Sequence, residues 1–272
     1  MDTLKDKTII YDPTCPLCVA YTGFFIKIGV LEKNGRVAFS KADESLLHKL
    51  DLNRARHEIP LYDKATGEVL YGLDGLTLIV SRLLPFTAGF VTRPWFKAII
   101  RPFYKFISYN RKLIANSPTV TEGFDCSPDY HFGWRAALAL FGVGYTGLCI
   151  WLFAAVLHLP HIPLLFAAVF AYFLLLQAVN LAYHKTWQQR LDYTTHLAVL
   201  GLIEGTLFLA GATLGAVTGF IGLMFAGQGA GRLFALWLHS KRVSNNGYAL
   251  QTNIAFATGA VALITYLAYV LK

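Results

Sequence analysis

Long apolar runs in the second half of the chain most restrict what this sequence can fold into. A helix needs about 20 predominantly apolar residues to cross a bilayer. From about Trp134 onward, five stretches reach that length: residues 136–158, 162–183, 194–212, 214–238 and 252–271. The chain of 272 residues is 55% hydrophobic and only 15% charged, which is too apolar for an ordinary soluble protein. We therefore expect an all-α transmembrane helix bundle of about five helices in residues 134–272.

The division between the third and fourth runs is less clear than the others. The sequence "LFLAGATLGAVTGF" offers only glycines as a turn, so a re-entrant hairpin is the competing interpretation. Small residues also let helices approach closely, which predicts a compact bundle. The glycines concerned are Gly201, Gly205, Gly211, Gly215 and Gly219.

Basic residues near the ends of the runs predict the orientation. Loops rich in Lys and Arg tend to stay in the cytoplasm, and "HKTWQQR" and "HSKR" follow the second and fourth runs. This pattern predicts an integral membrane protein with a cytoplasmic N-terminal domain and with Lys272 on the opposite side. The first ten residues contain no apolar segment of the secretory type, so nothing in them indicates export of that domain.

The net charge of +8 could indicate nucleic-acid binding, but the placement of the basic residues does not. Arg93, Lys97, Arg101 and Lys105 recur every four residues, and aromatic and aliphatic side chains lie between them. This is typical of a helix in the headgroup region of a membrane, with its basic side chains near anionic lipid. A helix packed on its own domain is the alternative. The apolar residues are Trp95, Phe96, Ile99, Ile100, Phe103, Phe106 and Ile107.

We therefore treat residues 87–133 as a basic amphipathic juxtamembrane segment. Its expected partner is the lipid bilayer, and we expect no nucleic acid as a partner. Pro94 and Pro102 each suit the first turn of a helix. Two short helices are expected there.

Residues 1–86 alternate between strand and helix patterns. Short β-type runs occur at 7–12 and 36–43, and two more surround a Thr-Gly turn within 58–72. Helical spacing follows Cys15 and recurs at 44–52 and 73–84. The order β-α-β-α-β-β-α, with a C-x-x-C motif where the first strand meets the first helix, is that of a thioredoxin or glutaredoxin core. The predicted fold is thus an α/β thioredoxin-like domain before the membrane bundle.

The position of Cys15 and Cys18 favours redox chemistry. Cys15 would lie at a helix N-terminus, where free N–H groups favour the thiolate, and Cys18 one turn later could attack a mixed disulfide on Cys15. A structural zinc site usually needs four ligands, and only Cys126 and Cys149 remain, far apart in sequence. A structural disulfide is rare on a reducing cytoplasmic face. Metal binding and inert structure remain alternatives.

Two neighbouring residues complete the predicted site. In thioredoxin-like folds a cis-proline opens the strand beside the dithiol and leaves a backbone edge free for a thiol substrate. Pro60 has that position, although a proline that opens a strand is common for other reasons. Asp12 could cap the helix or adjust the proton affinity of the thiol, and capping is the favoured interpretation.

Three segments, "YDPTCPLC", "GEVLYGLDGLTLIVSRLLP" and "YKFISYNRKLIA", resemble the DCC family of thioredoxin-like thiol-disulfide oxidoreductases. Asp12, Cys15 and Cys18 match the first motif of the family. Gly72–Gly75 match its "GADA"-type stretch loosely, and Tyr109–Arg111 match its "YNR" segment. The resemblance implies thiol-disulfide exchange and implies no particular substrate.

This resemblance covers roughly residues 8–126. Pro13 and Thr14 stand where glycine is usual in the family. This departure affects the loop before the dithiol and leaves the two cysteines intact. The membrane half resembles no family that we identify.

Ionisable residues within the apolar runs need partners. Glu204 lies in the middle of the third run, and Arg232 lies in the fourth at a depth that differs by only about 5 Å. We expect an ion pair between Glu204 and Arg232, with a structural role favoured over proton transfer. Gln228, Arg232 and His239 share one helical stripe.

Four histidines, His131, His184, His196 and His239, are predicted near the cytoplasmic membrane level. Histidines on separate helices at one depth could bind haem, a metal or the head group of a quinone. The candidate cofactor-binding residues are His184, His196 and His239, although interfacial histidines also occur without such a role. No metal ligands are assigned, and dithiol exchange itself requires no cofactor.

Together these features predict a membrane-bound thiol-disulfide oxidoreductase with a cytoplasmic dithiol and a protein or small-molecule thiol or disulfide as substrate. Electron exchange with the membrane domain is an open extension. Two alternatives remain: a transporter or lipid-binding protein with a redox-sensing dithiol domain, and an assembly factor that delivers metal.

Overall fold

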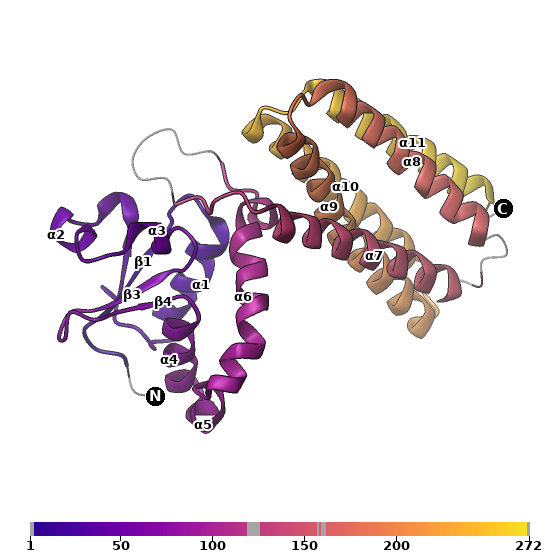
Figure 1. Ribbon diagram of the computed structural model, residues 1–272. Coiled ribbons are helices and arrows are strands. Elements are labelled where there is room, and N and C mark those ends of the chain that lie inside the picture. Colours follow the sequence, from indigo (N-terminus) through magenta and orange to yellow (C-terminus); the bar gives the residue numbers. More distant parts are fainter. Residues whose placement is uncertain (1–2, 119–125, 157, 159–161, 271–272) are drawn as a thin grey trace. The chain divides into compact units, whose positions relative to one another are not determined.

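The computed structural model describes residues 3–118, 126–156, 158 and 162–270. It separates into two compact units, Met1–Trp134 and Arg135–Lys272 (Figure 1). We call them the N-terminal unit and the C-terminal unit.

The N-terminal unit is built on a mixed four-stranded sheet. Its strands are β1 (Lys7–Tyr11), β2 (Arg36–Ala38), β3 (Pro60–Asp63) and β4 (Val69–Tyr71), in the order β2-β1-β3-β4. β1 is parallel to β2 and antiparallel to β3, and β4 returns antiparallel to β3. A β-α-β unit followed by a hairpin confirms the predicted thioredoxin-like fold.

Both faces of the sheet are covered. Successive side chains of a strand point to opposite faces, and Ile9 and Ile10 of β1 enter separate apolar clusters accordingly. On one face, α1 (Pro16–Lys27) and α4 (Leu73–Leu83) pack their side chains against Ile9. On the other face, Ile10 packs with residues from the segments after β2 and from β3 and β4: Phe39, Leu50, Ala55, Tyr62 and Tyr71.

The expected helix at 44–52 is divided in two. α2 (Glu44–Leu47) ends before the predicted end, and α3 (Leu52–Ala55) begins anew. The Asp51 side chain accepts a hydrogen bond from the Arg54 N–H at 3.0 Å, which is the geometry of a helix N-cap. Because Asp51 starts a new helix, the earlier one cannot continue through it. Short 3-10 helices lie at Phe39–Lys41 and Pro85–Thr87.

The prediction of two short helices around Pro94 and Pro102 is wrong. After α5 (Ala88–Val91), one helix of 22 residues, α6 (Pro94–Ala115), continues through Pro102. An internal proline removes one helical hydrogen bond, but α6 is fixed on both sides of it. Lys97 donates to Asp74 of α4 at 2.7 Å, and the Tyr104 hydroxyl accepts from the Ile59 N–H at 3.3 Å.

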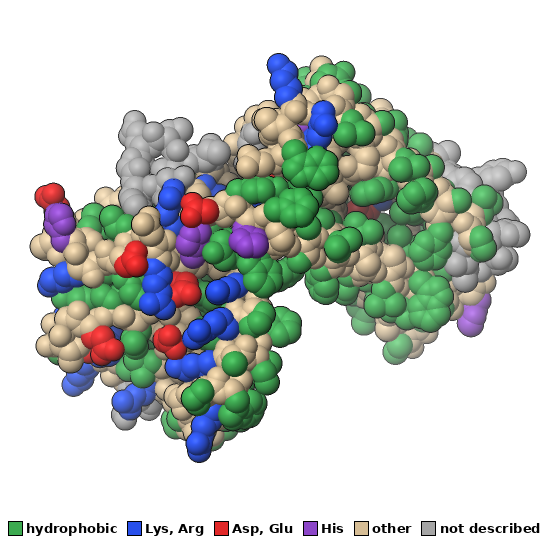
Figure 2. All heavy atoms as spheres, in the orientation of Figure 1, with side chains coloured by type: hydrophobic (Ala, Val, Ile, Leu, Met, Phe, Trp, Pro, Cys, Tyr) green, Lys and Arg blue, Asp and Glu red, His purple; other side chains and the backbone are tan. Residues whose placement is uncertain are grey.

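One side of α6 packs on its own unit and another side is open. Near its C-terminal end, α6 buries Ser108, Asn110, Arg111 and Leu113. A row at four-residue spacing stays exposed: Trp95 (52%), Ile99 (56%), Phe103 (64%) and Ile107 (47%). Hydrophobic and basic side chains lie next to each other along this helix (Figure 2). Contact of this row with lipid stays a prediction.

Among the residues that the structure describes, five long helices form the C-terminal unit, and α7 (Phe132–Val156) starts just before the division. The others are α8 (Ile162–Tyr183), α9 (Trp187–Thr218), α10 (Ile221–Asn246) and α11 (Leu250–Val270). Within the described residues, α7, α8 and α9 are long and apolar enough to cross a membrane, judged by length and composition. Membrane crossing by α10 and α11 stays a prediction.

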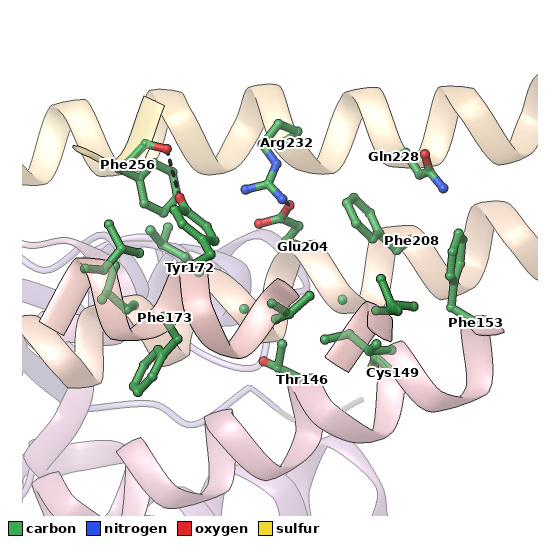
Figure 3. Close-up of a pocket in the computed structure, with 18 residues that line it drawn as sticks. Thr146, Cys149, Phe153, Tyr172, Phe173, Glu204, Phe208, Gln228, Arg232 and Phe256 are labelled. Atoms are coloured by element: carbon green, nitrogen blue, oxygen red, sulfur yellow. Dashed lines mark hydrogen bonds and ion pairs between the residues drawn. The ribbon is translucent and has the colours of Figure 1, made fainter. Parts of the chain in front are cut away.

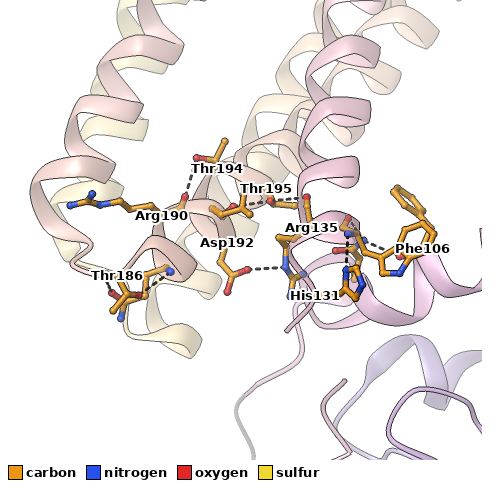
Figure 4. Close-up of polar contacts among 12 residues, drawn as sticks. Phe106, His131, Arg135, Thr186, Arg190, Asp192, Thr194 and Thr195 are labelled. Carbon is orange, nitrogen blue, oxygen red and sulfur yellow. Dashed lines mark hydrogen bonds and ion pairs between the residues drawn. The ribbon is translucent and has the colours of Figure 1, made fainter. Parts of the chain in front are cut away.

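α9 is longer than the sequence suggests at both ends. Thr186 and Gln189 form a reciprocal capping box at its start, so most of the expected "HKTWQQR" loop is helical. Next to this start, Arg135 of α7 pairs with Asp192 at 2.8 Å, and the Thr195 hydroxyl donates to the Arg135 carbonyl at 3.3 Å (Figure 4). These contacts fix the beginning of α9 against α7.

The glycines expected to form a turn are helical. α9 continues to Thr218 and ends at Gly219, whose φ of +70° suits a glycine cap. A Cβ on Gly211 would lie 2.8 Å from the Cα of Gly227 on α10, so the glycines bring two helices together. The re-entrant hairpin and the division at residue 213 are therefore incorrect.

Candidate functional site

The dithiol occupies the start of α1, and local structure explains its geometry. Pro16 fills the first helical position, where a missing N–H costs nothing, and Cys15 is the N-cap. The Cys15 Sγ accepts a hydrogen bond from the Cys18 N–H at 3.4 Å. Cys15 has no exposed surface and Cys18 is 5% exposed, and both are free thiols. The structure thus brings the two predicted cysteines together at a helix N-terminus.

The surroundings shift the pKa values of the two cysteines in opposite directions. The Cys18 thiol hydrogen bond lowers the pKa of Cys15 to about 6, against the opposing effect of burial. The Cys18 N–H and the positive charge of Arg111 lower it further, and Asp12 raises it. The same hydrogen bond, followed by burial, raises the pKa of Cys18. Near neutral pH, Cys15 is therefore the thiolate and Cys18 its proton-donating partner.

Asp12 does not cap the helix, contrary to the favoured interpretation. Its Oδ1 accepts from the Thr14 N–H at 2.9 Å and from the Thr14 hydroxyl at 2.7 Å. Asp12 lies three residues before the N-cap, so its carboxylate closes the loop before the helix, and the Cys15 sulfur takes the capping role. The buried carboxylate instead acts on the proton affinity of Cys15, which was the other interpretation.

Arg111 is a site residue that sequence spacing did not identify. It lies on α6, is 8% exposed, and its Nη2 is 3.9 Å from the Asp12 Oδ2. The same nitrogen donates to the carbonyl of Cys126. The sequence signal for this residue is its match to the "YNR" segment, which by itself assigns Arg111 no role.

A cavity of about 280 Å³ adjoins the dithiol on the Cys18 side. α1 contributes Leu17, Cys18 and Tyr21, and α6 contributes Tyr104 and Arg111. Burial raises the pKa of Tyr104 to about 12, so the hydroxyl stays protonated near neutral pH. The cavity is mostly apolar. Other lining residues include Ile10, Asp12, Phe39, Ile59, Leu76, Ile107, Ser108 and Cys126.

Pro60 opens β3 as predicted, but the Ile59–Pro60 peptide bond is trans. The expectation of a cis bond is therefore wrong. Both backbone groups of Ile59 are already bonded: its N–H donates to Tyr104, and its carbonyl accepts from the Gly72 N–H at 2.9 Å. These bonds hold the chain extended into the strand. Pro60 pairs in register with Tyr71.

Cys126 lies in the N-terminal unit with the dithiol, although it stands 108 positions after Cys18 in the sequence. It is 2% exposed, belongs to the cluster around Ile10 and lines the dithiol cavity. Sequence spacing alone does not predict that Cys126 lies at the dithiol site.

The polar residues of the C-terminal unit are also close to each other. The Arg232 Nη2 lies 2.6 Å from the Glu204 Oε1, and both side chains are largely buried. Gln228 and Arg232 line a cavity, whereas His239 from the same stripe contacts His196. The stripe therefore divides between two polar sites.

The candidate cofactor histidines gather around Tyr193, whose ring centroid lies 5.1–6.2 Å from those of His184, His196 and His239. The His196 Nε2 and His239 Nδ1 are 2.8 Å apart and the two rings are stacked. Their facing nitrogens therefore bind each other. His184 hydrogen bonds to Asn180 at 2.8 Å.

In the part of the chain that the structure describes, no three His, Cys, Asp or Glu side chains are grouped to hold a metal ion. His131 lies in the N-terminal unit, where its Nδ1 accepts from the Trp134 N–H at 3.3 Å.

Comparison with known proteins identifies the family of the first unit. Residues 9–116 match the family model described as DCC1-like thiol-disulfide oxidoreductase. No curated protein and no solved structure matches the chain. The match covers most of β1, the other three strands, the dithiol and Arg111. The N-terminal unit therefore contains a thioredoxin-like domain of the DCC1-like thiol-disulfide oxidoreductase family.

Proposed function

We propose that this protein is a membrane-bound thiol-disulfide oxidoreductase in which Cys15 is the attacking thiolate and Cys18 the resolving thiol. The observation that carries the proposal is the contact of the Cys15 sulfur with Cys18 at the start of α1. It supplies a stabilised thiolate and a nearby thiol at one point of the domain. Thioredoxin-like exchange needs both.

The exchange has two balanced steps. The Cys15 thiolate attacks a substrate disulfide, forms a mixed disulfide and releases one substrate thiolate. Cys18 then loses its proton and attacks the Cys15 sulfur, which releases the second substrate thiolate and leaves a Cys15–Cys18 disulfide. Two electrons pass to the substrate, and a thiol reductant restores the dithiol. The reverse sequence oxidises a dithiol substrate.

Burial limits the form of the substrate. Because Cys15 is fully buried and Cys18 nearly so, a folded protein surface cannot reach either sulfur without displacing neighbouring side chains. The adjoining cavity of about 280 Å³ favours a small thiol or disulfide, or one side chain of an extended segment. Pro60 opens β3 next to Ile59, which lines this cavity, and we infer that Pro60 shapes the substrate groove.

A glutathione titration of the full-length protein tests the proposal. Free thiols are trapped after equilibration at graded ratios of reduced to oxidised glutathione. We expect a reversible two-electron transition that Cys15→Ser and Cys18→Ser each remove. Cys149→Ser, which changes a buried cysteine of α7, is the matched control and should leave the transition in place. Two thiols that never pair at any ratio would contradict the proposal.

The proposal places the N-terminal unit in the cytoplasm. Basic residues after α8 and in the last part of α10 support this orientation through the positive-inside tendency. In sealed inside-out vesicles, a membrane-impermeant maleimide should react with Lys41→Cys, an exposed site of the N-terminal unit. Protection of this site in inside-out vesicles and labelling in right-side-out vesicles would reverse the orientation.

The proposal also includes electron exchange between the dithiol and the C-terminal unit. Its support is the cost of burying an ion pair and a histidine pair in membrane helices, which is more than a simple membrane anchor requires. Reduced Cys15–Cys18 should reoxidise more slowly in aerated membranes that carry Glu204→Gln than in wild-type membranes. An unchanged rate would limit the C-terminal unit to anchoring.

A further inference from the structure

A cavity of about 150 Å³ lies inside the C-terminal unit. Figure 3 shows the side chains that surround it: Thr146 and Cys149 from α7, Tyr172 from α8, Glu204 and Phe208 from α9, Arg232 from α10 and Phe256 from α11. Most of the lining is apolar or aromatic. A cavity of this volume with apolar walls accepts a ring the size of benzene.

The polar end of the cavity is neutral overall. Arg232 points toward Glu204 in Figure 3, and the two charges pair at 2.6 Å. A charged ligand would leave one uncompensated charge among apolar side chains, which is strongly unfavourable. The occupant should therefore carry no net charge.

One donor at this end lacks a partner. The Nε of Arg232 is buried, and within the described residues no acceptor bonds it. Arg232 itself is only 8% exposed. A buried N–H without an acceptor costs free energy, and a carbonyl oxygen in the cavity would remove that cost. The Tyr172 hydroxyl also lines the cavity, and it donates to the Phe256 carbonyl at 2.8 Å.

We propose that this cavity binds an uncharged six-membered ring that bears a carbonyl oxygen, the chemistry of membrane-soluble quinones. The ring lies among the aromatic side chains, and its carbonyl accepts a hydrogen bond from Arg232. The membrane supplies such a ligand because an apolar quinone partitions into lipid. The proposal is independent of dithiol exchange.

The test compares two probes that share one carbon skeleton. Duroquinone carries two carbonyl groups on a ring with four methyl groups, and durene has the same methyl groups on a plain benzene ring. Neither adds to thiols. Binding is measured by equilibrium dialysis with the full-length Cys15→Ser/Cys18→Ser protein in nanodiscs, with empty nanodiscs as the baseline. Redox turnover at the dithiol then cannot contribute, so failure here and failure of the exchange activity are separate results.

We expect saturable duroquinone binding and weaker binding of durene. Arg232→Lys retains the charge opposite Glu204 but removes the guanidinium donors, so duroquinone affinity should fall about tenfold or more. Val169→Phe fills the cavity from α8 and should abolish binding of both probes. Val143→Phe makes the same change on the exposed surface of α7, where Val143 is 46% exposed, and should alter nothing.

Two results would overturn the inference. Duroquinone binding that is equal in the Val169→Phe and Val143→Phe proteins would place the ligand elsewhere or in bulk lipid. Equal affinity for durene and duroquinone, unchanged by Arg232→Lys, would mean that the cavity holds hydrocarbon such as an acyl chain and does not recognise a carbonyl.

Discussion

The dithiol site and the cavity at the Glu204–Arg232 pair both hold charge among apolar side chains, but they compensate it by different means. In the N-terminal unit, the negative Cys15 sulfur is stabilised by a thiol, a backbone N–H and a distant guanidinium. In the C-terminal unit, two full charges compensate each other directly. The first arrangement leaves a reactive atom, whereas the second leaves a neutral pair.

The largest expected effect removes the reactive atom itself. Cys15→Ser should reduce exchange to the uncatalysed background, because a serine hydroxyl is not ionised near neutral pH and cannot replace the thiolate. Cys18→Ser should retain the first attack and accumulate a mixed disulfide on Cys15. Mass spectrometry after incubation with oxidised glutathione distinguishes the two outcomes. Rapid thiol-disulfide exchange by the Cys15→Ser protein would show that the Cys15 sulfur is not the reactive atom of the N-terminal unit.

The next effect concerns stability in the C-terminal unit. Arg232→Ala leaves Glu204 buried without a partner, which should cost about 3–5 kcal/mol of unfolding free energy. Arg101→Ala on the exposed side of α6 is the control and should cost less than about 0.5 kcal/mol. Thermal unfolding of the full chain in detergent measures both. Equal midpoints would show that the ion pair contributes nothing to the fold.

A smaller effect concerns the guanidinium in the N-terminal unit. Arg111→Met should raise the pKa of Cys15 from about 6 by about one unit, because a nearby positive charge favours the thiolate. The midpoint of the pH profile for alkylation by iodoacetamide should move upward. Asp12→Asn should move it downward, because a negative charge that opposes the thiolate is lost. Shifts of equal sign in both variants would point to a change of loop structure.

The smallest effect concerns the exposed row of α6. A bimane label on Ile99→Cys should be quenched more strongly by brominated lipid than the same label on Arg101→Cys, because only the first lies in the apolar row. The background lacks the four natural cysteines. We expect a change of less than about 1 kcal/mol in stability from either label, because both positions are exposed. Equal quenching would favour a row that faces water.

Local features of the dithiol site could be predicted from the sequence, and its distant contacts could not. The strand before Cys15 and the proline after it determine the helix N-terminus within a few residues. Arg111 approaches Asp12 from 99 positions away, and spacing carries no information about such a contact. The family resemblance brought the two residues into one pattern but assigned Arg111 no role.

The two wrong predictions about helices, at Pro102 and at the glycines of α9, have a common physical cause. Pro102 and the glycines of α9 are poor helix formers in isolation, so local propensity predicts a break at Pro102 and a turn at the glycines. In the structure, contacts with neighbouring elements stabilise the helix on both sides of Pro102, and Gly211 adjoins Gly227 without space for a side chain. Tertiary packing therefore decided both cases against local propensity.

The Cys15 cap has a consequence for the redox poise of the domain. The thiolate exists only in the reduced protein, and it is there that the sulfur accepts from Cys18. Formation of the disulfide removes the charge and with it the favourable interaction at the start of α1. Whatever stabilises the reduced form raises the reduction potential of the couple. The geometry that makes Cys15 a good nucleophile thus also makes the Cys15–Cys18 disulfide a better electron acceptor. We expect this disulfide to be reduced by a thiol pool more readily than the disulfide of a similar cysteine pair without the cap.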